Sequence, residues 1–250
     1  MATIYEFTDP FLGTYRPVPL VADGICEICH WTVNPGYEQC WSCEQAMIGV
    51  SRPIELVVPI SVYRVGEQLH TVLRNYKDSE PGPVQDRLRA QVASMVARFL
   101  LLHRPCIVEA AGDLDWQAIT TVPSSRPDRP PPHPLEQVLG LVSELRQAHI
   151  RTLARGLDPI DHNRPSDRGY EVIADIRERR LLLLDDTYTS GARLQSAASA
   201  LQRAGATVVA AVVVGRVVKP EFSDASRQLW NTVCASPFSF DVCCLDSHGE

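Results

Sequence analysis

Apolar runs separated by amphipathic stretches dominate the second half of the chain. Residues 181–184 and 207–214 consist almost entirely of Leu, Val and Ala, which is typical of strands buried on both faces of a sheet. Between these runs, apolar residues recur at helical spacing from Leu194 to Leu201, and Gly205 provides a helix stop. The order strand, helix, strand within about 35 residues predicts a βαβ unit in an α/β fold with a parallel sheet.

Similar but weaker patterns occur in the rest of the chain. Pro59 lies within the apolar segment 55–63 and predicts an edge strand, because proline cannot donate a ladder hydrogen bond. The remaining segments are assigned from the spacing of their apolar residues. They are helices over 66–76, 83–103 and 135–148, strands over 106–110, 116–123 and 238–245, and irregular chain over 1–25 and 151–169.

Composition and charge narrow the class of protein. The 250 residues are 45% hydrophobic, enough for one sizeable core or a core with a small module. The net charge of -6 argues against sequence-independent nucleic-acid binding over the whole surface. The N-terminal residues lack the basic and apolar regions of a signal peptide, and the longest apolar run is well short of the roughly 20 residues that span a bilayer. We therefore expect a cytoplasmic protein without a membrane span.

The cysteine spacing predicts a metal site. Two C-x2-C pairs, separated by ten residues, can present four thiolates to one zinc ion. Four protein ligands close the coordination sphere, which indicates a structural metal; the alternative is a group of buried or free thiols. We expect a lead-in and zinc ribbon over 1–50, followed by an α/β domain over 51–250. The predicted zinc ligands are Cys26, Cys29, Cys40 and Cys43.

Other cysteine and aromatic side chains are expected to pack rather than to bind a metal. His30 and Trp31 follow a predicted ligand directly but are more typical of packing residues. Cys243 and Cys244 would point to opposite faces of a strand, so they are poor joint ligands. Because free cysteines are often buried, we expect both to lie in the core.

Two adjacent carboxylates, Asp185 and Asp186, end the apolar run 181–184. Such a pair at a strand end is repulsive and costly to desolvate unless a cation or hydroxyl groups occupy the site. A ribose diol matches two neighbouring acceptors, and Mg²⁺ also matches them. Ligands of α/β sheets bind at the carboxyl ends of the strands. The following segment, 189–192, offers hydroxyls and backbone N–H groups for an anion, so a phosphorylated sugar is the predicted ligand.

Arg193 falls in the first turn of the predicted helix, where a cation opposes the helix dipole. A bound phosphate would remove that conflict. The alternative is that Arg193 is solvated and that Asp185 and Asp186 are a helix cap and surface charge.

The segment 183–192 resembles the 5-phosphoribosyl 1-pyrophosphate (PRPP) binding motif of type I phosphoribosyltransferases. That motif is an apolar strand, two acids, two variable residues, Thr-Thr/Ser-Gly and a helix. Together with the four-cysteine module, the chain is similar to the bacterial ComF family of competence-associated phosphoribosyltransferase-like proteins. Weaker similarities are the stretch from Tyr63 to Lys77, Val122-Pro123 followed by Arg126 and Arg129, and Arg164 with Arg168-Gly169-Tyr170.

The resemblance implies a type I phosphoribosyltransferase fold with an N-terminal zinc ribbon. The two acids would hold the ribose hydroxyls and residues 189–192 the 5′-phosphate. The loop at 123–129 would face pyrophosphate, and the loop at 155–169 would be a flexible cover. The implied PRPP-binding residues are Asp185, Asp186, Thr187, Thr189, Ser190, Gly191, Ala192 and Arg193.

Catalysis in such enzymes is stabilisation of the leaving group by Mg²⁺ and cationic donors. The candidate donors are Lys77, Arg126, Arg129, Arg164 and Arg168, and each has a solvated surface role as its alternative. The chain differs from the family at Arg193, where a small hydroxylic residue is usual. It also differs at 130–134, where a proline-rich run replaces a segment of the type Arg-Gly-Phe-Asn-Gln.

Three functions are compatible with these features. The first is an enzyme that transfers phosphoribose from PRPP to a nitrogen acceptor. The second is a non-catalytic PRPP- or nucleotide-binding module that works with protein partners in DNA uptake or recombination. The third, weakest hypothesis is single-stranded DNA stacking on Trp31, Tyr37 and Trp41 of the ribbon. The sequence does not identify the acceptor substrate. It also leaves the oligomeric state open, and a homodimer is one possibility.

Overall fold

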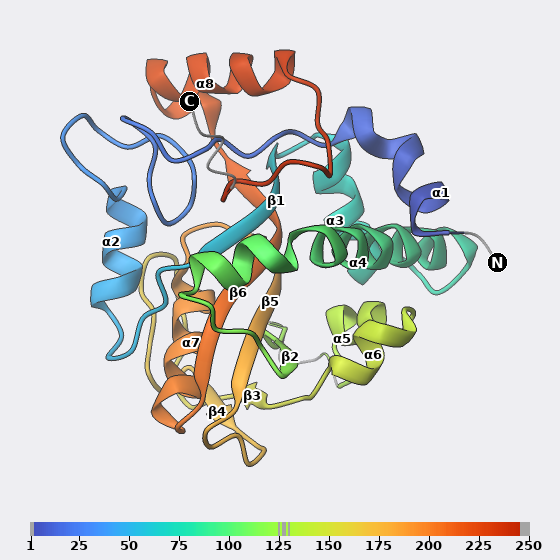
Figure 1. Ribbon diagram of the computed structural model, residues 1–250, viewed down its shortest axis with the longest axis vertical. Helices are drawn as coiled ribbons and strands as arrows, with labels where there is room; N and C mark the ends of the chain where they lie inside the picture. Colours follow the sequence, from blue (N-terminus) through green and yellow to red (C-terminus); the bar gives the residue numbers. More distant parts are fainter. Residues whose placement is uncertain (1–2, 125, 127–128, 130, 246–250) are drawn as a thin grey trace.

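A four-stranded parallel sheet forms the centre of the protein in the computed structural model (Figure 1), which describes residues 3–124, 126, 129 and 131–245. Its strand order is β1-β6-β5-β2, and each neighbouring pair is parallel. The strands are β1 (Val57–Arg64), β2 (Ala118–Thr121), β5 (Arg180–Tyr188) and β6 (Thr207–Val218). The predicted α/β architecture with a parallel sheet flanked by helices is confirmed.

Helices cover both faces of the sheet (Figure 1), and strand β5 shows how the sequence divides the core. Leu182 and Leu184 pack with residues of α3 (Gln68–Asp78) and α4 (Pro83–Ala110), whereas Leu181 and Leu183 pack with α7 (Ala192–Arg203). Alternate side chains of a strand point to opposite faces, so a continuous apolar run fills both layers. The other elements are α1 (Ile4–Thr8), η1 (Asp9–Thr14), α2 (Trp41–Ile48), α5 (Pro134–Leu139), α6 (Ser143–Ala148), β3 (Leu153–Arg155), β4 (Tyr170–Val172), η2 (Pro220–Phe222) and α8 (Asp224–Ala235).

Several predicted elements are confirmed with shifted bounds. Strand β1 lies at the edge of the sheet, as Pro59 predicted. Helix α7 and strand β6 complete the βαβ unit at the predicted place. Within the described part of the chain, the helices are all too short or too polar to cross a membrane. The division at residue 50 stays a prediction.

Two predicted strands are wrong. Residues 106–110 form the last turns of α4, which continues past Pro105 because the helix buries Ile107 completely. A proline inside a helix costs about 3 kcal/mol, and packing outweighs that cost here. Residues 238–245 include no strand among those described; this segment instead places Phe240, Cys243 and Cys244 in the core. Both cysteines pack there, as predicted.

Other segments are more structured or more broken than predicted. The lead-in contains α1 and η1, and Tyr15 anchors it in the core. The predicted helix over 135–148 is two helices, because α5 ends at Gly140. The irregular stretch 151–169 begins with β3, which pairs antiparallel with β4. Helix α8 was not predicted, and β5 runs on through Asp185 and Asp186 to Tyr188.

Gly215 of β6 is expected to be intolerant of a side chain. A Cβ there would lie 2.5 Å from the Tyr63 ring and 3.0 Å from Leu73. Replacing Gly215 by Ala should lower the free energy of unfolding by roughly 1–3 kcal/mol in denaturant titration, because a packed core resists added volume. Gly13→Ala is the matched control, since nothing lies within 4 Å of its added Cβ. Equal stability of the two variants would contradict this packing.

Candidate functional site

The two acids lie near the carboxyl end of the central strand β5 and are almost completely buried. Asp185 is 4% exposed and Asp186 is 7% exposed. The neighbouring strand β2 ends at Thr121, opposite Leu184. The acids therefore come directly after the point where β2 gives way to the loop that begins at Val122. This is the position at which parallel α/β sheets bind ligands.

Asp186 is paired with a cation. Its carboxylate lies 2.6 Å from Nζ of Lys77 and accepts a hydrogen bond from the hydroxyl of Tyr76. Burial alone would raise the pKa of Asp186, but Lys77 and the Tyr76 hydrogen bond hold it below its usual range. Both partners come from the last turn of α3, so this ion pair joins the end of α3 to the centre of the sheet.

Asp185 is in the opposite electrostatic situation. Burial, with a further contribution from Asp186, raises the pKa of Asp185 to about 6 although Arg193 opposes the shift. Its Oδ1 accepts the backbone N–H of Asp186 at 2.9 Å. Among the described residues, Asp185 thus has no direct ion pair of the kind that Asp186 has. It would gain from a ligand that donates hydrogen bonds or carries positive charge.

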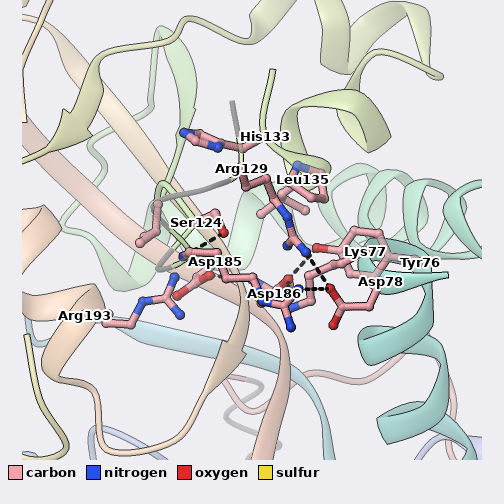
Figure 2. A pocket seen from close by; sticks show the side chains of 13 residues that line it. Tyr76, Lys77, Asp78, Ser124, Arg129, His133, Leu135, Asp185, Asp186 and Arg193 are labelled. Atoms are coloured by element: carbon pink, nitrogen blue, oxygen red, sulfur yellow. Dashed lines mark hydrogen bonds and ion pairs between the residues drawn. The ribbon is translucent and has the colours of Figure 1, made fainter. Parts of the chain in front are cut away.

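Arg193 faces the acid pair from α7 rather than pointing to solvent. Figure 2 shows it on one side of Asp185 and Asp186, with Lys77 and Tyr76 on the other. Its Nη2 donates to the carbonyl of Pro123 at 3.1 Å. Its buried Nε has no hydrogen-bond partner among the described residues. Although burial disfavours its charge, Asp185 raises the pKa of Arg193. The alternative of a solvated Arg193 beside surface acids is wrong.

A cavity of about 110 Å³ opens over the acid pair (Figure 2). Arg126 and Arg129 reach it from the loop after β2, and both pair with Asp78, Arg126 at 3.2 Å. The structure therefore brings together three of the five predicted donors, Lys77, Arg126 and Arg129, although they come from separate segments. The lining residues are Tyr76, Lys77, Asp78, Val122, Ser124, Arg126, Arg129, His133, Pro134, Leu135, Asp185, Asp186 and Arg193.

The other two predicted donors lie elsewhere. Arg164 and Arg168 belong to the loop 155–169 and are not among the described residues that line the cavity. Arg168 is on the surface, with Nε 3.8 Å from Asp158. The loop packs against the β5–α7 connection, because the backbone N–H of Asn163 donates to Oγ of Ser190 at 3.2 Å.

The predicted phosphate loop follows the acids but does not line the same cavity. Thr189 is exposed, and Ala192 begins α7. Gly191 has φ 83° and precedes that helix, with the Tyr188 ring beneath it: an added Cβ would lie 2.3 Å from the Tyr188 hydroxyl. Only glycine meets both conditions without strain. Thr187, the residue before Tyr188, has its Oγ1 3.3 Å from the hydroxyl of Tyr63.

The four predicted zinc ligands are gathered in one place. Their sulfur atoms all lie within 4.8 Å of one another. Sγ of Cys29 and Sγ of Cys40 are 3.8 Å apart, the separation expected for a tetrahedral site with Zn–S bonds of about 2.3 Å. Cys40 precedes α2 and Cys43 lies in its first turn. The cluster can hold a metal ion such as zinc and is compatible with a zinc ribbon.

Tyr188 and Arg216 connect the cysteine cluster to the predicted phosphate loop. The Tyr188 hydroxyl lies 3.3 Å from Sγ of Cys43. Arg216 stacks over the Tyr188 ring, donates to the carbonyl of Thr189 at 2.6 Å and approaches Sγ of Cys29 at 3.6 Å. Hydrogen bonds from the other thiols, that of Cys26 first, and the charge of Arg216 hold the pKa of Cys29 well below its usual range.

Sequence reasoning missed the partners that complete both sites. Tyr76 and Asp78 flank Lys77 at the end of an amphipathic helix. These three adjacent polar groups were the signal that could have predicted their joint role. Arg216 is a single cation in a valine-rich strand, a pattern that implies a buried partner. The proposed stacking role of Trp31 is wrong, because Trp31 is buried against Trp230 with ring centroids 6.4 Å apart.

The two acids are expected to respond oppositely to neutralisation. The raised pKa of Asp185 means that its ionisation destabilises the fold as the pH rises from about 4 through 6. Asp185→Asn should therefore increase the free energy of unfolding at pH 7.5, by up to roughly 2–3 kcal/mol, and this gain should vanish near pH 4.

Asp186→Asn should instead destabilise the protein at pH 7.5 by roughly 1–3 kcal/mol, because it leaves Lys77 without its partner. Because the pKa of Asp186 is lowered, its contribution to the free energy of unfolding is present above the usual carboxyl pKa and is lost on acidification. Asp224→Asn, at a side chain 86% exposed, is the control and should change little. Shifts of the same sign for both buried acids would contradict these assignments.

Loss of the metal is expected to loosen the loop at 188–192. In zinc-loaded protein, Cys40→Ser should remove the zinc ion of the four-cysteine cluster and speed amide hydrogen exchange at 188–192 at least about tenfold, or about 1.4 kcal/mol. The buried strand segment 181–184 should keep its protection, which separates local loosening from unfolding. Cys234→Ser, at an exposed cysteine, is the control. Zinc loss with unchanged exchange at 188–192 would show that Tyr188 and Arg216 do not couple the two sites.

Comparison with known proteins adds no family to this description. The chain matches none of the protein-family models scanned against it, and a search of curated proteins finds no match. The features that bear on function are therefore the acid pair, its cations and the cysteine cluster. The residues place a polar, cation-rich cavity at the carboxyl end of a parallel sheet and a four-cysteine cluster that could hold a metal ion beside the following loop.

Proposed function

We propose that this protein binds PRPP with Mg²⁺ at the acid pair and belongs among the ComF-like proteins of type I phosphoribosyltransferase fold. One observation carries the proposal. Two adjacent carboxylates are buried at the carboxyl end of the central strand, and four cations surround them: Lys77, Arg126, Arg129 and Arg193. A ligand that carries hydroxyls for the acids and negative charge for the cations satisfies both halves of this arrangement.

The ribose ring would lie over the acids. Its two neighbouring hydroxyls would donate to Asp185 and Asp186, and this contact relieves the burial cost of Asp185. The 5′-phosphate would lie at residues 189–192, because the first N–H groups of α7 favour an anion.

The size of the cavity sets a condition on binding. Sites for drug-sized ligands measure roughly 300–1,000 Å³, whereas this cavity measures about 110 Å³. Lys77 and Arg129 occupy the space because they reach to Asp186 and Asp78. A pyrophosphate group offers these cations equivalent oxygen partners, so ligand binding would exchange internal ion pairs for pairs with the ligand.

Mg²⁺ fits this site as an ion that arrives with the substrate. Asp186 already has Lys77 and Tyr76 as partners, so few protein oxygens are left for an ion. Mg²⁺ commonly binds through one or two carboxylates together with substrate phosphates and water. When bound it would supply charge neutralisation to the pyrophosphate, and Asp185 is the carboxylate best placed to contact it.

The proposed reaction is transfer of phosphoribose to a nitrogen acceptor. As the bond to pyrophosphate breaks, negative charge grows on the leaving group, and Lys77, Arg126 and Arg129 would stabilise it. The acids would hold the ribose as positive charge develops on the ring. Arg164 and Arg168 would contribute only if the loop 155–169 moves over the site, since they lie outside the cavity.

A non-catalytic PRPP-binding module is the second candidate, acting with protein partners in DNA uptake or recombination. It is favoured by the pairing of both Arg126 and Arg129 with Asp78, which draws them toward a protein carboxylate. Pyrophosphate release separates the two candidates. The enzyme hypothesis expects release from PRPP with at least one member of a panel of nucleobases and amines, and binding without release supports the module.

Calorimetry with PRPP and Mg²⁺ tests binding itself. Asp186→Ala should weaken binding about 10- to 100-fold, because it removes a charge-assisted hydrogen bond worth roughly 1.5–3 kcal/mol. Asp224→Ala is the matched control, since that exposed acid lies in α8, away from the lining residues. Equal affinities of wild type and Asp186→Ala, or no binding by wild type, would reject the proposal.

A further inference from the structure

A second cluster of metal-ligating side chains lies where the C-terminal segment crosses α4. His103 and Cys106 are three residues apart on this helix, so they share one face. Cys243 approaches them from the segment after α8. One ligand atom of each residue lies within 4.8 Å of the other two. None of the three belongs to the four-cysteine cluster or lines the cavity over the acid pair.

The separations within this cluster are close to those around a tetrahedral zinc ion. Zn–S bonds of about 2.3 Å and Zn–N bonds of about 2.0–2.1 Å place two sulfur ligands about 3.8 Å apart and a sulfur and a nitrogen about 3.5 Å apart. Sγ of Cys106 lies 3.5 Å from Nδ1 of His103 and 3.4 Å from Sγ of Cys243. Shifts of a few tenths of an ångström would complete the geometry.

The surroundings orient His103 and Cys243 as ligands. The Nε2 atom of His103 lies 2.7 Å from the carbonyl oxygen of Phe240. A carbonyl can only accept, so Nε2 carries the hydrogen and Nδ1 presents its lone pair to the sulfur atoms. Metal-binding histidines are commonly fixed by such a contact. The backbone N–H of Leu245 donates to Sγ of Cys243 at 3.4 Å, which favours a thiolate there.

Burial and charge select the kind of ion. His103 is 3% exposed and Cys243 is 5% exposed, and the Phe99 ring lies 4.7 Å from the His103 ring. In so apolar a place a ligand set with no net charge is the least costly to bury. Two thiolates and a neutral imidazole balance a divalent cation, and thiolate and imidazole ligands suit zinc.

We propose that His103, Cys106 and Cys243 bind a second zinc ion that fastens the C-terminal segment to α4. Zinc binding releases the protons of both thiols to solvent. In the metal-free protein the thiol of Cys106 donates a hydrogen bond to the carbonyl oxygen of His103 at 3.1 Å. The described residues supply three ligands, which leaves a fourth position for a further ligand such as water. Phe240 then stays in place against Tyr15, so the ion also secures the N-terminal lead-in.

Metal analysis of the full chain, purified in reductant with added zinc, tests this proposal. Wild type should contain two zinc ions per chain, and Cys243→Ser and His103→Ala should each contain one. Cys234→Ser, at an exposed cysteine of α8, is the matched control and should keep two. Cys40→Ser should keep the ion at His103, which shows that the sites are independent. One zinc ion in wild type, unchanged in Cys243→Ser, would overturn the proposal.

A second measurement uses wild type alone and does not depend on the folding of a variant. Alkylation followed by mass spectrometry should leave Cys106 and Cys243 unmodified in zinc-loaded protein and modify them after a zinc chelator is added. Cys234 should react in both states. Protection that a chelator does not change would reject a metal. A mass two hydrogens lower, with Cys106 linked to Cys243, would identify a disulfide instead and equally overturn the zinc site.

Discussion

The burial of two adjacent carboxylates in the central strand is the constraint on which the arrangement of this protein depends. A buried charge is tolerated only when a partner compensates it. Asp186 is compensated by Lys77 and Tyr76, which brings the end of α3 to the sheet. Arg193 faces Asp185 from α7 and holds the carbonyl of Pro123. One electrostatic requirement therefore positions a helix, a loop and the βαβ connection around the same cavity.

The buried charge of Asp185 is only partly compensated by its neighbours. Asp185 keeps a raised pKa, so its ionisation is unfavourable, and a ligand that donates hydrogen bonds or carries positive charge would relieve that cost. The neighbouring Asp186 is satisfied within the protein. This difference between adjacent residues arises from geometry alone, since the last turn of α3 reaches only the second acid. It is the physical reason for proposing a binding site here rather than a structural ion pair.

The four-cysteine cluster contacts residues that surround the loop after the two acids. Tyr188 contacts Cys43 and supports Gly191, and Arg216 spans from the cysteine sulfur atoms to the carbonyl of Thr189. An arginine buried in a valine-rich strand is costly unless it has such acceptors. Through these contacts the four-cysteine segment helps to hold the loop that follows the two acids.

Much of this could be predicted from sequence, because some signals depend only on near neighbours in the chain. The paired C-x2-C spacing, the apolar runs of β5 and β6 and the acids between strand and helix are local patterns, and the structure places each as predicted or close to it. Strands over 106–110 and 238–245 were wrong, since short apolar segments suit either a strand or other buried chain. Only the tertiary structure decided that Asp78 pairs with Arg126 and Arg129, that Arg216 reaches Cys29, and that Cys243 meets His103. These contacts join residues that are distant in sequence. Strand order and helix packing decide which residues meet, and the local spacing of apolar residues does not encode either.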